Sequence, residues 1–188
     1  MARITVKLSR ITSVENVVHG ELGNDLFEHG RSQLLHFHDV GELVDLEDSI
    51  STLRLAAEIT DDEHPDKPMY LHYLGVSWLR RYERLGGLAD LEHALSNLQK
   101  AVQFAGDSHP NQPMYLSILG NSQLRHYERY GTWTDLEDSM SNLQKAIHFC
   151  EDGDPKKSIY LSNLGGGHMI RYEHLGERND LEAGMLNL

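Results

Sequence analysis

The chain carries 12 histidines and one cysteine among 188 residues, which are the residue types that most often hold metals or act as nucleophiles. A metal chelate on a helix needs ligands three or four residues apart with supporting carboxylates. His36 and His38 are two residues apart and would point to different helix faces. His64 and His109 each directly precede a proline, which favours hydrogen bonding within a loop. The spacing therefore predicts no metal site.

Nucleophilic and phosphate-binding chemistry is disfavoured in the same way. Cys150 and His148 are two residues apart, so they would not face each other on a helix, and no third group orients the base. The acidic clusters at 61–66 and 151–154 lack the spacing of a calcium loop. A glycine-rich phosphate cradle follows a strand, and no strand is predicted before the glycines at 165–167. We predict no catalytic residue and no cofactor, and hence a protein that is not an enzyme.

The charge balance narrows the choice of partner. Seventeen Lys and Arg residues against 29 Asp and Glu residues give a formal charge of -12, which repels a phosphate backbone. The first ten residues lack the long apolar stretch of a signal peptide, and no apolar run approaches the length that spans a bilayer. The expectation is an intracellular, cytoplasmic protein whose partner is neutral to basic and is neither nucleic acid nor membrane.

Self-similarity is the strongest signal in the sequence and defines the elements that position any site. Three segments starting at Gly41, Gly86 and Gly131 align without a gap, and a fourth start lies at Gly176. Successive starts are 45 residues apart (86-41, 131-86 and 176-131). The register extends backward to about Asn24. The array therefore covers residues 24–188 as four units, the last one short.

Each unit is predicted to form two helices. The first, typified by residues 69–85, has apolar residues at helical spacing, and the glycine that follows it suits a left-handed helix end and a turn of about four residues. The second opens with Asp-Leu-Glu, whose aspartate is interpreted as a helix N-cap. The N-cap aspartates are Asp45, Asp90, Asp135 and Asp180. Proline-containing loops join consecutive hairpins, so the fold class expected is an all-α right-handed α-solenoid.

The repeated Leu-Gly pairs at 74–75, 119–120 and 164–165, the tyrosines at 82, 127 and 172, and the alanines at 94 and 101 resemble the tetratricopeptide repeat. The common unit of that family has 34 residues, and HEAT or armadillo units also suit a period of 45. The sequence looks like the long tetratricopeptide arrays of basidiomycete fungi, which accompany a CHAT (caspase-like) or nucleotide-binding signalling domain. The resemblance implies a binding scaffold without catalysis. The alternative is a structural or oligomerisation array that regulates such an effector domain.

The resemblance also implies where a ligand would meet the array, because first helices line the concave face in that family. Its contact positions lie one and five residues after the Leu-Gly glycine and three residues before it. Unlike the packing positions, these positions vary between the repeats. They correspond here to His72, Val76, Arg80, Ser117, Asn121, Arg125, Ser162, Gly166 and Ile170. Ser117 stands where the chaperone-tail clamp of the family has a lysine, so that ligand is not predicted.

The two ends of the chain give separate expectations. In residues 1–23, Ile4, Val6 and Leu8 alternate as in a short strand, and the segment is interpreted as a cap on the first hairpin or a linker. In the last unit, the apolar residues Leu186 and Leu188 would lack a covering helix. We therefore expect a homodimer through residues of about 159–188.

Overall fold

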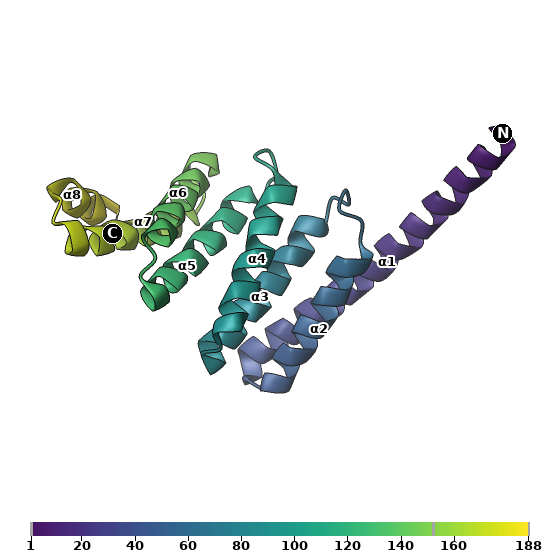
Figure 1. Cartoon of the computed structure of the whole chain (residues 1–188), viewed down its shortest axis with the longest axis horizontal. Helices are drawn as coiled ribbons and strands as arrows, with labels where there is room; N and C mark the ends of the chain where they lie inside the picture. The colour runs from purple at the N-terminus through teal and green to yellow at the C-terminus, as the bar shows by residue number, and fades with distance from the viewer. Residues whose placement is uncertain (1, 152, 188) are drawn as a thin grey trace. The chain divides into compact units, whose positions relative to one another are not determined.

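The structure is a computed structural model that describes the backbone of residues 2–151 and 153–187 and the side chains from residue 20 onward. The described residues form eight helices and no strand (Figure 1). In chain order these are α1 (Ala2–Val40), α2 (Leu43–Ile59), α3 (Lys67–Leu85), α4 (Leu88–Ala105), α5 (Gln112–Tyr130), α6 (Trp133–Phe149), α7 (Lys157–Leu175) and α8 (Arg178–Asn187). The helices divide into two compact units, Met1–Phe104 and Ala105–Leu188. The expected all-α class of consecutive helix hairpins is confirmed.

Glycines end the first helix of each hairpin, as predicted. Gly86 follows α3 with φ of 72°, and its N–H donates to the Tyr82 carbonyl over 2.7 Å. Gly131 and Gly176 repeat the same left-handed conformation after α5 and α7. A side chain at such a φ would be strained, so glycine is the residue that lets the chain reverse here. The turn is shorter than expected, because only two residues separate α3 from α4.

The aspartates at the second helices do not act as N-caps, which corrects the sequence interpretation. The helix α2 begins at Leu43 after the N-cap Glu42, so Asp45 is already the third helical residue. Its carboxylate pairs with His36 nine residues earlier, at 2.7 Å. An aspartate in the first turn is favoured by the helix dipole without capping, so its oxygens remain available to the preceding helix. The same pairing between residues nine apart recurs in Arg81–Asp90, His126–Asp135 and Arg171–Asp180.

In the first unit, aromatic packing joins α1 to α3, and a close backbone approach joins α3 to α4. Phe27 of α1 stacks on Tyr70 of α3 with ring centroids 4.8 Å apart, and both side chains are buried. Close packing against α4 accounts for the glycine of the Leu-Gly pair in α3. A Cβ on Gly75 would lie 2.7 Å from Leu98 Cγ and 3.2 Å from the Ala94 carbonyl. The small residue therefore lets α4 approach α3.

In the second unit, glycines likewise allow α5 to pack closely against α6 and α7 against α8. A Cβ on Gly120 would lie 3.0 Å from both Leu143 Cγ and the Ser139 carbonyl. A Cβ on Gly165 would lie 3.2 Å from the Gly184 carbonyl. The core here is formed by buried residues of α5, α6 and α7, namely Tyr127, Leu136, Met140, Leu143 and Leu164. The helix α7 stays continuous through its three consecutive glycines.

The predicted strand near residues 4–8 is wrong, because α1 runs without a break from Ala2. The N-terminal part of α1, purple in Figure 1, extends beyond the ends of α2 and α3. An alternation of three apolar residues is too short to establish a strand, and no glycine or proline interrupts the first 19 residues. The interpretation of residues 1–23 as a cap or linker stays a prediction.

Candidate functional site

The residues predicted to contact a ligand form one stripe on each first helix. His72, Val76 and Arg80 are four residues apart on α3, and the corresponding triplets lie on α5 and α7. Residues four apart share a helix face, so each stripe presents a single line of side chains. The α3 stripe belongs to the first unit, and the α5 and α7 stripes belong to the second.

The stripes are not uniformly accessible. His72 is 5% exposed and Ser117 is 3% exposed, so both lie within the packed interior of their units. Accessibility rises along α3 and α5, where the middle residue of each stripe is half-buried and the last one is exposed. The members that a ligand can reach are Val76, Arg80, Asn121, Arg125, Ser162, Gly166 and Ile170.

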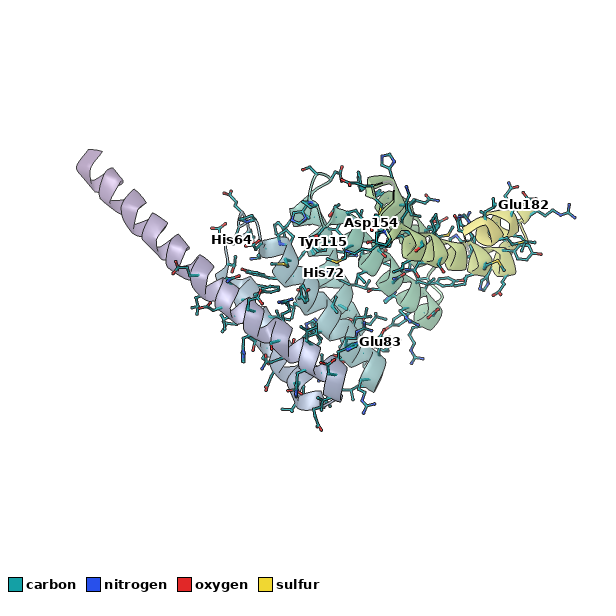
Figure 2. All side chains as sticks on the ribbon, turned by 180° about the vertical axis from the view of Figure 1, so that it is seen from behind. His64, His72, Glu83, Tyr115, Asp154 and Glu182 are labelled. Carbon is teal, nitrogen blue, oxygen red and sulfur yellow. The ribbon has the colours of Figure 1, made fainter. Side chains whose placement is uncertain are left out.

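His72 has an environment that makes it a structural residue. Its ring lies edge-on to Tyr73 with centroids 5.5 Å apart, inside the first unit (Figure 2). Burial lowers the pKa of His72 to about 4, because a charged imidazole would lose its hydration there. The side chain is therefore neutral at pH 7.

The arginines of the stripes are tied to their own helices. Arg80 pairs with Glu83 at 2.7 Å, and Arg125 pairs with Glu128 at 3.6 Å. Exposed pairs three residues apart on a helix contribute little, typically under about 1 kcal/mol. A ligand carboxylate or carbonyl can therefore displace the glutamate at small cost.

One predicted residue borders a pocket in the second unit. Ile170 lies with Tyr127, Glu128, Gly131 and His174 around a hollow of about 410 Å³. The His174 ring meets Tyr127 edge-on with centroids 6.0 Å apart. The repeat pattern predicts a packing role for Tyr127 and does not indicate His174, because the corresponding residues of the other units are Arg84 and Arg129.

A larger groove lies in the first unit, on a face that the sequence reasoning did not select. It has a volume of about 510 Å³ and is floored by α3 between walls from α2 and α4. The floor residues 71, 74 and 78 are centred roughly half a helical turn away from residues 72, 76 and 80, at 3.6 residues per turn. We call it the Trp78 groove, and it is lined by Arg54, Ala57, Glu58, Asp62, Lys67, Leu71, Leu74, Trp78, His93, Asn97, Lys100, Gln103 and Phe104.

The loop histidines behave as the sequence predicted. His64 Nδ1 accepts a hydrogen bond from the Asp66 backbone N–H at 3.2 Å, and His109 Nδ1 accepts one from the Asn111 N–H at 3.1 Å. In the third loop Asp154 replaces histidine, and its carboxylate accepts the Lys156 N–H at 2.8 Å. These side chains therefore shape the loops between hairpins. Separately, the described residues contain no cluster of three metal-ligating side chains.

Cys150 has the character of a structural thiol. The side chain is buried, and burial together with a hydrogen bond to Asp154 raises the pKa of the thiol. A thiol with a raised pKa is mostly protonated at pH 7 and is a poor nucleophile. The neighbouring His148 is exposed, and its ring centroid lies 5.5 Å from that of Phe149.

Comparison with known proteins identifies the class of fold. Neither a protein-family model nor a curated protein matches this sequence. Among solved structures, a kinesin light chain-like protein of Podospora anserina with nearly identical TPR-like repeats is similar to this chain. Its TM-score is 0.58 at 14% identity, over 88% of this chain and 74% of that one. A de novo designed helical repeat protein has a TM-score of 0.50 at 15% identity, over 92% of each chain.

At these identities the likeness defines the fold, which is that of an all-α solenoid of TPR-like helical repeats. No helix among the described residues has the length and apolar character needed to cross a membrane.

Proposed function

We propose that this chain is a non-catalytic scaffold that binds a protein or peptide through the accessible residues of its first helices. The observation that carries the proposal is a contrast within the repeat. The packing positions Leu74, Leu119 and Leu164 of α3, α5 and α7 are the same residue and are buried, whereas the middle stripe positions of these helices are all different, namely Val76, Asn121 and Gly166. A regular frame that presents variable side chains is suited to recognising an irregular partner.

The proposed partner is neutral to basic. The formal charge of -12 creates an attractive field for a basic segment, and the field raises the association rate at low salt. The association rate should fall as salt rises, because ions shorten the range of that attraction to about 8 Å at physiological ionic strength.

The test uses fluorescently labelled peptides of matched length that carry a net positive, zero or negative charge. Fluorescence anisotropy should show binding of the positive or neutral peptides, with an association rate that falls as salt rises. Asn121→Ala combined with Arg125→Ala should weaken binding of the neutral peptide by about tenfold, which corresponds to 1.4 kcal/mol, because both side chains can donate hydrogen bonds to peptide carbonyls. The control is Lys145→Ala, because Lys145 is an exposed residue of α6 that lies outside the stripes. Equal binding by wild type and the double variant contradicts the use of the stripes.

A second candidate role is self-association through the last hairpin, within about 159–188. Its helices expose large apolar side chains, of which Met185 is 68% exposed and Leu186 is 85% exposed. An identical face across a twofold axis can cover such residues. Light scattering over a concentration series should show a dimer that Leu186→Glu dissociates, and a strict monomer at high micromolar concentration rules this role out.

A further inference from the structure

The Trp78 groove of the first unit has an apolar floor and an aromatic centre. Leu71 and Leu74 of α3 form the floor, and Trp78 borders both this groove and an adjoining hollow of about 230 Å³. The indole ring lies 4.6 Å from the His93 ring, centroid to centroid, and the Arg81 guanidinium lies 5.5 Å from its centroid. Trp78 itself remains partly exposed, so an occupant of the groove would contact it.

Two cations face the groove without ion-pair partners among the described residues. Arg54 lies on the α2 wall and Lys100 lies on the α4 wall, and both are exposed. The other nearby cations are engaged within the fold. Lys67 pairs with Asp62 at 2.8 Å, and Arg81 pairs with Asp90 at 3.4 Å. The cationic character available to a ligand therefore comes from one side chain on each wall.

Apart from Asp62, which pairs with Lys67, the acidic residues of this surface lie at its ends. Glu47 and Glu58 are on the same face of α2, seven residues before and four residues after Arg54. The span from Glu47 to Glu58 measures about 16 Å at 1.5 Å per residue, which is the length of about five extended residues. The charge pattern is thus positive at the centre and negative at both ends.

This combination occurs at one place in the repeat. The positions corresponding to Trp78 hold Gln33, Gln123 and His168, and those corresponding to Arg54 hold Gln99 and Gln144. The groove is therefore a departure from the repeat pattern, and packing that is common to all hairpins does not account for it.

We propose that the Trp78 groove docks a protein segment that places an acidic side chain between apolar side chains. The apolar residues would cover Leu71, Leu74 and Trp78, and the carboxylate would lie between Arg54 and Lys100. An arginine can bind a carboxylate through two parallel hydrogen bonds, which fixes its position as well as adding attraction. A basic side chain at the centre is disfavoured, because it would bury like charges together. The inference concerns a different face of α3 from the proposed function.

Trp78 provides the reporter for the test. The chain has two tryptophans, so Trp133→Phe leaves Trp78 as the only one. The probe is the capped peptide Gly-Ser-Leu-Asp-Phe-Leu-Asp-Leu-Ser-Gly, compared with versions that carry Asn or Lys in place of both Asp residues. At physiological ionic strength the field of the whole chain is screened beyond about 8 Å, so local charges dominate. The Asp peptide should change Trp78 emission saturably and bind about tenfold tighter than the Asn peptide.

Charge reversal of the two walls tests the assignment directly. Arg54→Glu with Lys100→Glu should weaken Asp-peptide binding at least about tenfold and should favour the Lys peptide. Lys145→Glu is the matched control, because it occupies the position of Lys100 in the next repeat and is exposed. Circular dichroism confirms that each variant is folded.

Four results would overturn the proposal. They are equal binding of the Asp and Asn peptides, an affinity within twofold after the double reversal, an equal loss with Lys145→Glu, and no saturable change in Trp78 emission up to roughly 1 mM peptide. The Asn121→Ala and Arg125→Ala changes should leave Asp-peptide binding intact. Failure of this proposal and failure of the proposed function are therefore distinguishable.

Discussion

Residue 78 of the first unit and residues 123 and 168 of the second occupy the same position of the repeat with different chemistry. In the second unit the position is polar and satisfied, since Asn142 donates to Gln123 at 2.8 Å and His168 lies 2.9 Å from Asp180. In the first unit Trp78 offers no such acceptor, and Asn97 instead donates to the His93 carbonyl of its own helix at 2.7 Å. The open groove thus arises where an aromatic residue replaces a bridging side chain.

The pairs between the two helices of a hairpin also differ, most clearly between Asp45 in the first unit and Asp180 in the second. In the first unit, Asp45 and Asp90 each face one partner, His36 and Arg81 respectively. In the second unit, Asp180 is only 1% exposed and receives hydrogen bonds from Arg171 Nε at 2.9 Å while also lying beside His168. A buried carboxylate that is held by two groups should contribute far more than an exposed pair.

The largest expected effect separates these two kinds of pair. Asp180→Ala should lower the free energy of unfolding by about 3 kcal/mol, because it leaves the partly buried Arg171 without its partner. Asp45→Ala should cost under about 1 kcal/mol, because its partner His36 is 59% exposed. Urea unfolding followed by circular dichroism measures both, and equal losses would show that burial does not distinguish the pairs.

The same comparison has a pH dependence with a definite sign. Hydrogen bonds from Arg171 hold the pKa of Asp180 below its usual value, against the effect of burial. A lowered pKa in the folded state stabilises it above the unfolded pKa of about 3.9, and this contribution disappears as the pH falls through the folded pKa. The stability difference between wild type and Asp180→Ala should therefore shrink below about pH 4.

The next effect concerns His72, for which the second unit supplies natural counterparts in Ser117 and Ser162. The pKa of His72 is about 4 in the folded state, against about 6.5 for an unfolded histidine. The unfolded chain therefore binds the proton first, and the first unit should lose stability as the pH falls from about 6.5, by about 2 kcal/mol at pH 5.

His72→Ser isolates this effect. The variant should be less stable than wild type at pH 7, because it leaves space in the core, yet its stability should change less between pH 7 and pH 5. Trp78 emission in a Trp133→Phe background reports on the first unit during urea unfolding. Parallel pH profiles for the two proteins would show that His72 is not the titrating group.

The repeat made the frame predictable from sequence, because each position is sampled several times in one chain. The left-handed glycines after α3, α5 and α7, and the loop roles of His64 and His109, follow from that repetition. The repeat does not predict the Trp78 groove, because Trp78 departs from the residues at the corresponding positions and its neighbours on α2 and α4 are distant in sequence.

The pairing of the aspartates was hidden for a related reason. A carboxylate at a helix start has two physical uses, which are capping its own helix and accepting a bond from the helix before it. The sequence Asp-Leu-Glu is compatible with both. Only the two-residue turn, which brings residues nine apart together, selects the pair between helices.

The smallest effects concern the glycines of α7, where three neighbours in one helix meet different surroundings. Gly165→Ala would place a Cβ 3.2 Å from the backbone carbonyl of Gly184, so α8 must shift, at a cost of about 1 kcal/mol or more. Gly167→Ala would place one 2.9 Å from Met140 Cγ, which is a flexible side chain and yields more easily. Its cost should be smaller than that of Gly165→Ala.

Gly166→Ala should have the opposite sign, because a Cβ there meets nothing within 4 Å. Alanine in a helix interior is favoured over glycine by about 0.8 to 1 kcal/mol, so the variant should unfold at higher urea than wild type. Gly166 is also a stripe residue, which gives the change a second reading. If Gly166→Ala stabilises the second unit and also weakens binding of the positive or neutral peptides, the glycine serves close approach of a ligand. If it stabilises the unit and leaves binding intact, the α7 stripe does not contact that ligand at this position. A destabilised variant would contradict the open surroundings of Gly166.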